Sequence, residues 1–136
     1  MTSVPAKAEP HIAAIVALLD AALSINVYNG RRENDTDTMC VVVHGTPNAP
    51  FGSLGDRYAD ANVLFQVTAV GIGQEQAMAY ADDVQAALLT DTPPSVLGRV
   101  AWPVQFLASQ PVIRDDTVMP PLWIATAQYA IKSNPA

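Results

Sequence analysis

Cysteine is nearly absent from this chain of 136 residues, which contains only Cys40. A single cysteine excludes an intrachain disulfide. With two histidines it also leaves too few Cys and His side chains for the four ligands of a structural zinc site. A chain without disulfides is typical of a reducing compartment. We therefore expect a protein that assembles in a cytoplasm and needs no structural zinc.

Basic residues are the next scarce class. Seven Lys and Arg stand against thirteen Asp and Glu, which gives a net charge of −6, and only Arg31 and Arg32 are adjacent. Tight binding to DNA, RNA or an anionic membrane needs a clustered basic face, and this chain lacks the residues to build one. The same acidity is compatible with a passage through which a polyanion moves without sticking.

Long hydrophobic runs are missing as well. The uncharged run from Ile12 to Leu19 is too short to span a bilayer, and Asp20 ends it. The segment before it carries Lys7 and Glu9, a poor start for a signal peptide. Half of the residues are hydrophobic and 15% are charged, which is a globular composition. We expect no membrane association and one domain over residues 1–136, with residues 1–9 as a flexible arm.

Apolar periodicity and turn residues predict an α+β fold. The expected helices are 10–24 and 74–89, and the expected strands are 25–28, 38–44, 62–70, 97–108 and 122–132. Residues 29–37 form a solvated turn, and 45–61 and 109–121 form two long loops. Pro103 makes the strand at 97–108 an edge strand or a bulged one, because proline cannot donate to a ladder. The pattern predicts a mainly antiparallel sheet of four to five strands with two helices packed on one face.

Two glycine motifs resemble catalytic or nucleotide-binding loops but each lacks a required position. Gly71-x-Gly73 follows a strand and opens a helix, yet Gln76 stands where a dinucleotide loop has its third glycine. The segment from Gly52 to Gly55 resembles a nucleophile elbow, but Phe51 occupies the first glycine position. Tight turns explain both motifs without a ligand.

The candidate metal ligands also fail on spacing. Cys40 and His44 lie on one strand about 13 Å apart, too far for one metal, so we expect a buried cysteine and a histidine at the strand end. We expect His11 to be exposed near the helix start. Glu33, Asp35 and Asp37 alternate like a calcium loop, but the required glycine and closing glutamate are missing. The pairs Asp82-Asp83 and Asp115-Asp116 have no nearby His or Lys for acid–base work. The sequence therefore predicts no catalytic residue, no cofactor and no metal.

The second half of the chain is more informative. The segments 56–60 (DRYAD), 62–71 (NVLFQVTAVG), 75–89 (EQAMAYADDVQAALL) and 114–135 (RDDTVMPPLWIATAQYAIKSNP) follow one another in a recognisable order. Together with the leading helix, polar turn and strand, they resemble the tail-terminator, or tail-completion, proteins of actinobacteriophages with long non-contractile tails. The resemblance is one of pattern and order and covers roughly residues 10–135.

The resemblance implies structural work in a virion. Tail terminators cap the growing tail tube as a ring of six copies, stop further addition and offer a surface to the head connector. The implied partners are other copies of the chain, the major tail tube protein and the head-closure or connector protein. Genomic DNA would only pass through the lumen. The implied location is the head–tail junction of a siphovirus, with assembly in the bacterial host cytoplasm.

A ring needs a head-to-tail interface whose rotation closes, and charged loops that the core does not need are candidates for it. We expect these residues to make polar contacts between subunits or to the tube: Arg31, Arg32, Glu33, Asp35, Arg57, Arg114, Asp115 and Asp116. Solvated loop tips are the alternative interpretation for each of them.

Three other functions remain open from the sequence. One is a different neck component, such as a head-closure or head–tail adaptor protein, which shares the size and the ring assembly. Another is a minor tail or baseplate subunit at the far end of the tail. The last is a small enzyme or ligand-binding domain that uses a pocket between the second helix and the sheet, although no convergent polar set supports it.

Overall fold

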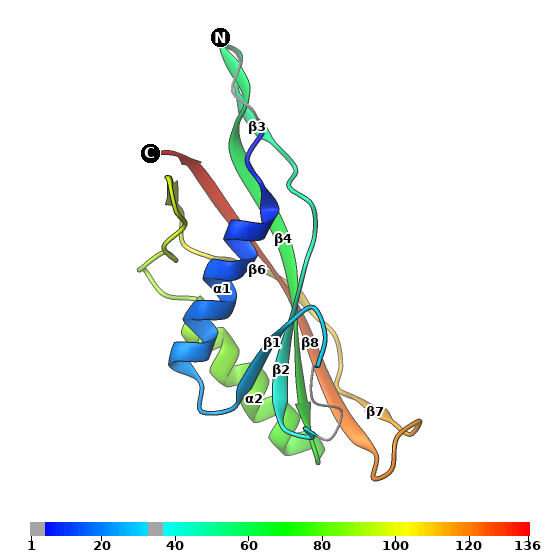
Figure 1. Ribbon diagram of the computed structural model, residues 1–136. Coiled ribbons are helices and arrows are strands. Elements are labelled where there is room, and N and C mark those ends of the chain that lie inside the picture. Colours follow the sequence, from blue (N-terminus) through cyan, green and yellow to red (C-terminus); the bar gives the residue numbers. More distant parts are fainter. Residues whose placement is uncertain (1–4, 33–36) are drawn as a thin grey trace.

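The computed structural model describes residues 5–32 and 37–136. Two helices and eight strands make an α+β fold, as predicted (Figure 1). The elements in chain order are α1 (Ala8–Ala22), β1 (Asn26–Asn29), β2 (Cys40–Gly45), β3 (Phe51–Ser53), β4 (Asp56–Gly71), α2 (Gln74–Leu88), β5 (Arg99–Ala101), β6 (Gln105–Ser109), β7 (Ile113–Asp115) and β8 (Leu122–Pro135).

The strands form one sheet in the order β1-β2-β4-β8-β5. The pair β1–β2 is parallel and the other pairs are antiparallel. Strands β5, β6 and β7 follow one another along β8, and β3 pairs with β4. The expected four to five strands are therefore eight. The edge beside β8 is divided into three short strands because Pro103 and Pro111, which cannot donate to a ladder, lie in its two gaps.

The edge character of this segment was predicted and is confirmed. Both β5 and β6 pair with β8, and the register of β6 shifts between Phe106 and Ala108. The expected continuous strand at 97–108 is therefore interrupted by Pro103 and then bulged.

The expected long loop at 45–61 is largely strand, whereas residues 109–121 are mostly loop, as expected. Residues 45–61 contain β3 and the first part of β4, joined by a tight turn at Leu54 and Gly55. Within residues 109–121, the three-residue strand β7 interrupts the loop. In the β3–β4 hairpin a side chain on Gly52 would collide with the carbonyl oxygen of Asp56. Glycine therefore allows the two backbones to approach closely there. The glycines and prolines that suggest loops thus mark hairpin turns.

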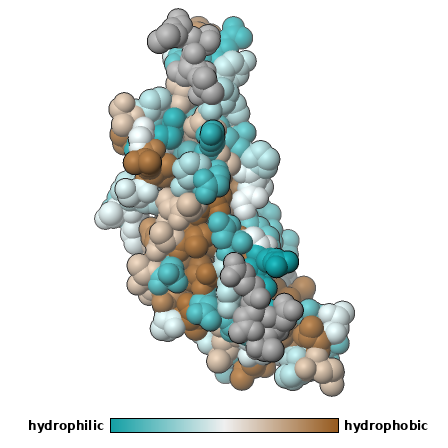
Figure 2. All heavy atoms as spheres, viewed as in Figure 1, coloured by the Kyte–Doolittle hydropathy of each residue, from teal (hydrophilic) through white to brown (hydrophobic). Residues whose placement is uncertain are grey.

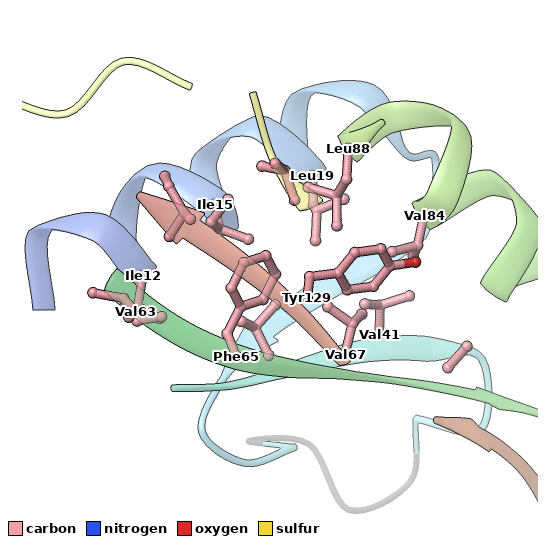
Figure 3. Packing of buried hydrophobic residues seen from close by; sticks show 14 of the residues in the cluster. Ile12, Ile15, Leu19, Val41, Val63, Phe65, Val67, Val84, Leu88 and Tyr129 are labelled. Carbon is pink, nitrogen blue, oxygen red and sulfur yellow. The ribbon is translucent and has the colours of Figure 1, made fainter. Parts of the chain in front are cut away.

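Both helices pack on the same face of the sheet, as predicted (Figure 3). Residues at alternate positions of β4, from Val63 to Ala69, point toward the helices, and Leu64 to Val70 point away. The core between helices and sheet contains Ile15 and Leu19 of α1, Val84 and Leu88 of α2, and Phe65 stacked on Tyr129. The ring centroids of that last pair are 5.7 Å apart. The sheet is therefore held rigidly by one apolar layer.

The far face of the sheet has a smaller cluster at one end. Cys40, Val42, Val70 and Leu122 are buried there, with Tyr28 and Val118 packed against them. This cluster ties the β1–β2 end of the sheet to the turn between β7 and β8.

Helix α1 starts two residues earlier than expected. Ala8 and Glu9, assigned above to the arm, belong to the helix, and Pro10 lies in its first turn. Proline is tolerated there because the first N–H groups of a helix have no intrahelical acceptor. The preceding backbone is also anchored, since Asn48 donates to the Ala6 carbonyl at 2.9 Å. Among the described helices, none is both long and apolar enough to cross a bilayer.

Candidate assembly interface

The β3 hairpin and β7, which adjoin Arg57 and contain Arg114 respectively, lie at opposite ends of the sheet (Figure 1). Arg57 is exposed beside the β3 hairpin, at the start of β4. Arg114 pairs with Trp123, and Trp123 pairs with Gly71 at the end of β4. Fourteen residues of extended chain between Arg57 and Gly71 correspond to roughly 45 Å. The structure therefore separates Arg57 from Arg114, Asp115 and Asp116.

At the Arg114 end, contacts within β7, β8 and the turn between them stabilise that turn. Arg114 Nε donates to Asp116 Oδ1 at 2.6 Å, although both side chains are more than half exposed. The Arg114 guanidinium also lies over the Trp123 ring, 5.9 Å from its centroid. Asp115 Oδ1 accepts from the hydroxyl and the backbone N–H of Thr117, and these hydrogen bonds lower the pKa of Asp115. The turn thus presents a fixed, exposed charge pattern.

Arg32 belongs to the same end of the molecule. Its Nη1 donates to the Asp37 carbonyl oxygen at 2.8 Å, while Arg31 is exposed. Asp37 Oδ2 accepts from Tyr28 at 2.7 Å and from Asn26 at 2.9 Å. Tyr28 in turn packs on the cluster that includes Val118 of the β7–β8 turn. The two predicted arginine groups, around residues 31–32 and at 114, are therefore brought to one end.

The Asp37 carboxylate is already satisfied by the protein. Burial alone would raise its pKa, but the hydrogen bonds from Asn26, Tyr28 and the Met39 N–H outweigh burial and lower it. The hydrogen bond between Tyr28 and Asp37 raises the pKa of Tyr28. Glu33 and Asp35, the other two acids of the calcium-like pattern and two of the predicted interface residues, lie outside the described residues.

The expectation for His11 is wrong. The side chain is fully buried, and its Nε2 accepts from the Ser133 hydroxyl at 2.7 Å while Nδ1 donates to the Lys7 carbonyl at 2.8 Å. Arg99 Nε donates to the same Ser133 oxygen at 2.7 Å. Burial, above all, lowers the pKa of His11, and the charge of Arg99 lowers it further. This network ties α1 to β8 and β5.

A signal for this network exists in the sequence. His11 precedes Ile15 and Leu19 at four-residue steps, which places it on the buried face of α1. The interpretation as an exposed residue relied on its place near the helix start and gave too little weight to that spacing. Nothing local marks Ser133 or Arg99 as its partners, because both come from the far end of the chain.

The predictions for Cys40 and His44 are confirmed. Cys40 is fully buried and His44 is exposed at the end of β2. Burial raises the pKa of the Cys40 thiol to about 11, so the thiolate is strongly disfavoured at neutral pH. Within residues 5–32 and 37–136, no three or more His, Cys, Asp or Glu side chains are grouped so that they could hold a metal ion.

In the Gly71-x-Gly73 turn, the side chain of Gln76 occupies the backbone N–H that a ligand would otherwise bind. Gln76 Oε1 accepts from the Ile72 N–H at 2.8 Å, and a side chain on Gly71 would approach the Ala77 nitrogen to 2.9 Å. The residue at the missing third glycine position therefore closes the turn. Tight packing between β4 and α2 explains why residue 71 is a glycine.

A groove does lie between α2 and the sheet, where the ligand-binding alternative would place it. It encloses about 250 Å³ and is lined by residues of α2, β6, the β6–β7 link and β8, among them Met78, Asp82, Phe106, Val112 and Tyr129. Its wall contains two ionisable groups, Asp82 and Tyr129. Burial, followed by the charge of Asp82, raises the pKa of Tyr129, so its hydroxyl stays protonated.

Comparison with known proteins gives a likeness in fold. No protein-family profile matches the chain, and no curated protein matches it in sequence. Among solved structures, a chain from the virion of a native gene transfer agent particle has a similar fold, with a TM-score of 0.61 at 16% sequence identity. The match covers 90% of this chain and 85% of that chain. At this identity the likeness concerns the fold.

Proposed function

We propose that this chain is a structural protein of a phage-like virion, without a catalytic role, that caps the tail tube as a homohexameric ring. The observation that carries the proposal is the fold shared, over most of both chains, with a virion chain of a gene transfer agent particle. The resemblance of residues 10–135 to tail terminators refines it to the position between tube and head connector. The genome would pass through the lumen.

The separation of charged groups supports a joining role. A protein that connects a tube to a connector needs two contact surfaces that face opposite ways. The long sheet presents Arg57 at one end and Arg114 and Asp116 at the other, roughly 45 Å apart. Each end carries exposed charge on a hairpin or turn that packing holds in place. Tube and connector would bind these two ends.

The distribution of charge also supports a channel that does not hold DNA. Helices α1 and α2 carry five acidic residues, Glu9, Asp20, Glu75, Asp82 and Asp83, and no Lys or Arg. Most of the net charge of −6 therefore lies on the helical layer. An acidic ring would repel the phosphate backbone and let DNA pass.

Inactivating the gene in its phage and measuring tails by negative-stain microscopy tests this proposal. We expect headless tails of uncontrolled length, because nothing ends tube growth. Tails of normal length that fail to join heads would instead indicate a head-closure or adaptor protein. Joined particles with a defect at the far tip would indicate a minor tail subunit. Normal infectious particles would overturn a structural role.

A further inference from the structure

Strand β6 is an unprotected sheet edge. All five of its residues are exposed, and among the described strands it pairs only with β8. Its sequence, QFLAS, has no charge, proline or glycine, while Phe106 and Leu107 are 43% and 47% exposed. Soluble proteins usually blunt such edges with charges, prolines or a covering segment, because free N–H and C=O groups recruit other strands. An uncharged apolar edge of this kind indicates a strand-pairing surface.

The opposite border of the sheet offers a matching edge. In the described sheet, β1 pairs only with β2, and its sequence NVYN is uncharged. Beside it, Val16 of α1 together with Ile25 and Val27 is only partly buried. Figure 2 shows hydrophobic atoms in a band between α1 and the strands. Both borders of the sheet therefore leave apolar surface next to a strand edge that pairs with no further described strand.

The strand directions of the two borders are compatible. Strand β1 runs parallel to β2, β2 antiparallel to β4, β4 antiparallel to β8, and β8 antiparallel to β6. It follows that β1 and β6 run in opposite directions. Copies related by rotation about a ring axis would place β6 of one copy antiparallel to β1 of the next. A head-to-tail contact of this kind repeats around a closed ring.

The faces of the sheet fix a register. If the helices of both copies lie on the same side, residues that face the same way must stand opposite each other. Asn26 and Tyr28 face away from the helices, as do Gln105 and Ala108, since their partners Cys40, Val42, Ala130 and Gln128 do. Leu107 is the extra residue of the bulge in β6, so the three steps from Gln105 to Ala108 match the two steps from Tyr28 to Asn26. Asn26 then opposes Ala108, and Tyr28 opposes Gln105.

The two edges are also compatible in charge. Neither β6 (QFLAS) nor β1 (NVYN) contains Asp, Glu, Lys or Arg, so their pairing would bury no unpaired charge.

We propose that β6 of one copy pairs antiparallel with β1 of a second copy, so that the sheets of neighbouring subunits join edge to edge. The inference rests on the proposed ring and specifies its subunit contact. The second copy covers Phe106, Leu107 and the open side of the groove.

Light scattering of the purified chain over a concentration series tests the contact. We expect the wild type to form oligomers larger than a dimer, and Leu107→Lys to remain a monomer because the new charge would lie in the joined sheet. The matched control is Ile72→Lys, a similarly exposed apolar residue away from both edges, 58% exposed in the β4–α2 turn. A monomeric wild type, or oligomers unchanged by Leu107→Lys, would overturn the proposal.

Cross-linking tests the register and direction. Mixing a chain that carries Asn26→Cys with one that carries Ala108→Cys should give an intercopy disulfide, because opposed residues in a sheet lie within bonding reach. Asn26→Cys mixed with Gln105→Cys should give far less. The buried Cys40 stays unreactive in both mixtures. Disulfides between Gln105→Cys and Ala108→Cys chains would reveal a two-fold β6–β6 contact and overturn the proposal.

The two proposals fail in different ways. An oligomer with the expected cross-link, from a chain whose gene is dispensable for tail length, would refute the tail-capping function and leave the edge contact standing. Tails of uncontrolled length after gene inactivation, with no cross-link in the purified oligomer, would refute the edge contact alone.

Discussion

At the scale of single residues, His11 is the position at which sequence and structure differ most. Its imidazole is neutral in the folded chain, held between the Lys7 carbonyl and the Ser133 hydroxyl. Burial lowers its pKa below the ordinary value of 6.5. At a pH between the folded and unfolded pKa values the unfolded chain binds more protons. Folding stability contributed by His11 is therefore complete above about pH 6.5 and is lost as the pH falls.

Urea unfolding at neutral and mildly acidic pH measures this effect. The wild type should lose stability as the pH falls below about 6.5, and His11→Gln should lose less, because its side chain does not titrate. The control is His44→Gln at an exposed histidine, which should keep the wild-type dependence. Equal pH dependence in the wild type and His11→Gln would contradict the buried neutral state.

Two neighbouring glycines give a second residue-scale prediction. Gly71→Ala would press a methyl group within 2.9 Å of the Ala77 nitrogen and 3.1 Å of Gln76 Oε1. We expect it to lower the free energy of unfolding by roughly 1–3 kcal/mol. Gly73→Ala has nothing within 4 Å and extended backbone, so it should change stability by less than about 0.5 kcal/mol. Similar values for the two variants in chemical denaturation would contradict the packing described.

At the scale of elements, an aromatic cluster holds the β3 hairpin against the sheet. Phe51 and Trp102 meet edge to face with centroids 6.0 Å apart, and Lys132 Nζ lies about equally close to both rings. Trp102 Nε1 donates to Asn134 Oδ1 at 2.7 Å. The cluster therefore joins β3, β8 and the link between β5 and β6, far from the helical core.

Trp102→Ala should loosen this hairpin without unfolding the core. We expect the loss of about 1–2 kcal/mol of ring and cation contacts to be local. Hydrogen exchange should speed up in residues 51–60 and stay slow from Val63 to Ala69. Leu54→Ala at the tip, where the side chain is 94% exposed, should leave both regions unchanged. Unchanged exchange in the Trp102 variant would show that the cluster does not hold the hairpin.

The sequence predicts regular elements well where apolar alternation or helical spacing is strong. Helix α2 and the inner half of β4 appear at nearly the expected positions, because Val63 to Ala69 alternate cleanly. Residues 56–61, the first part of β4, are not predicted as strand because Asp56 and Asp60 interrupt the apolar pattern beside turn glycines. Its strand state is set by pairing with β3 and β8, which no local pattern encodes.

The candidate site is predictable only in part for the same reason. Exposed charge on loops identifies Arg31, Arg57 and Arg114 as free of the core. It does not show that Arg57 stands at the far end from the others, which depends on the length and pairing of β4. Pro103 does indicate the edge character of the β6 segment, but alternation alone does not show that Phe106 and Leu107 stay exposed there.

At the scale of the whole molecule, the proposed function requires that a long sheet join two partners at its ends and its own copies at its sides. Arg114→Glu tests one end. It places a carboxylate beside Asp115 and Asp116 in an exposed turn, so the yield of completed tails should fall. Folding should change by less than about 1 kcal/mol, because exposed ion pairs contribute little.

The comparison variant is Arg57→Glu at the opposite end, which should impair attachment to the other partner. Thermal unfolding of the purified variants controls for folding, and plaque counts with negative-stain images measure completion. Normal infectious particles from the Arg114 variant would remove that residue from the interface.

The central claim is the position of this protein at the junction of head and tail. Gold-labelled antibody against the purified chain, applied to intact particles and to isolated tails, measures that position directly. The account predicts label at the head-proximal end of the tail, in numbers consistent with a ring. Label at the distal tip, along the whole tube, or on tail-less heads alone would contradict it.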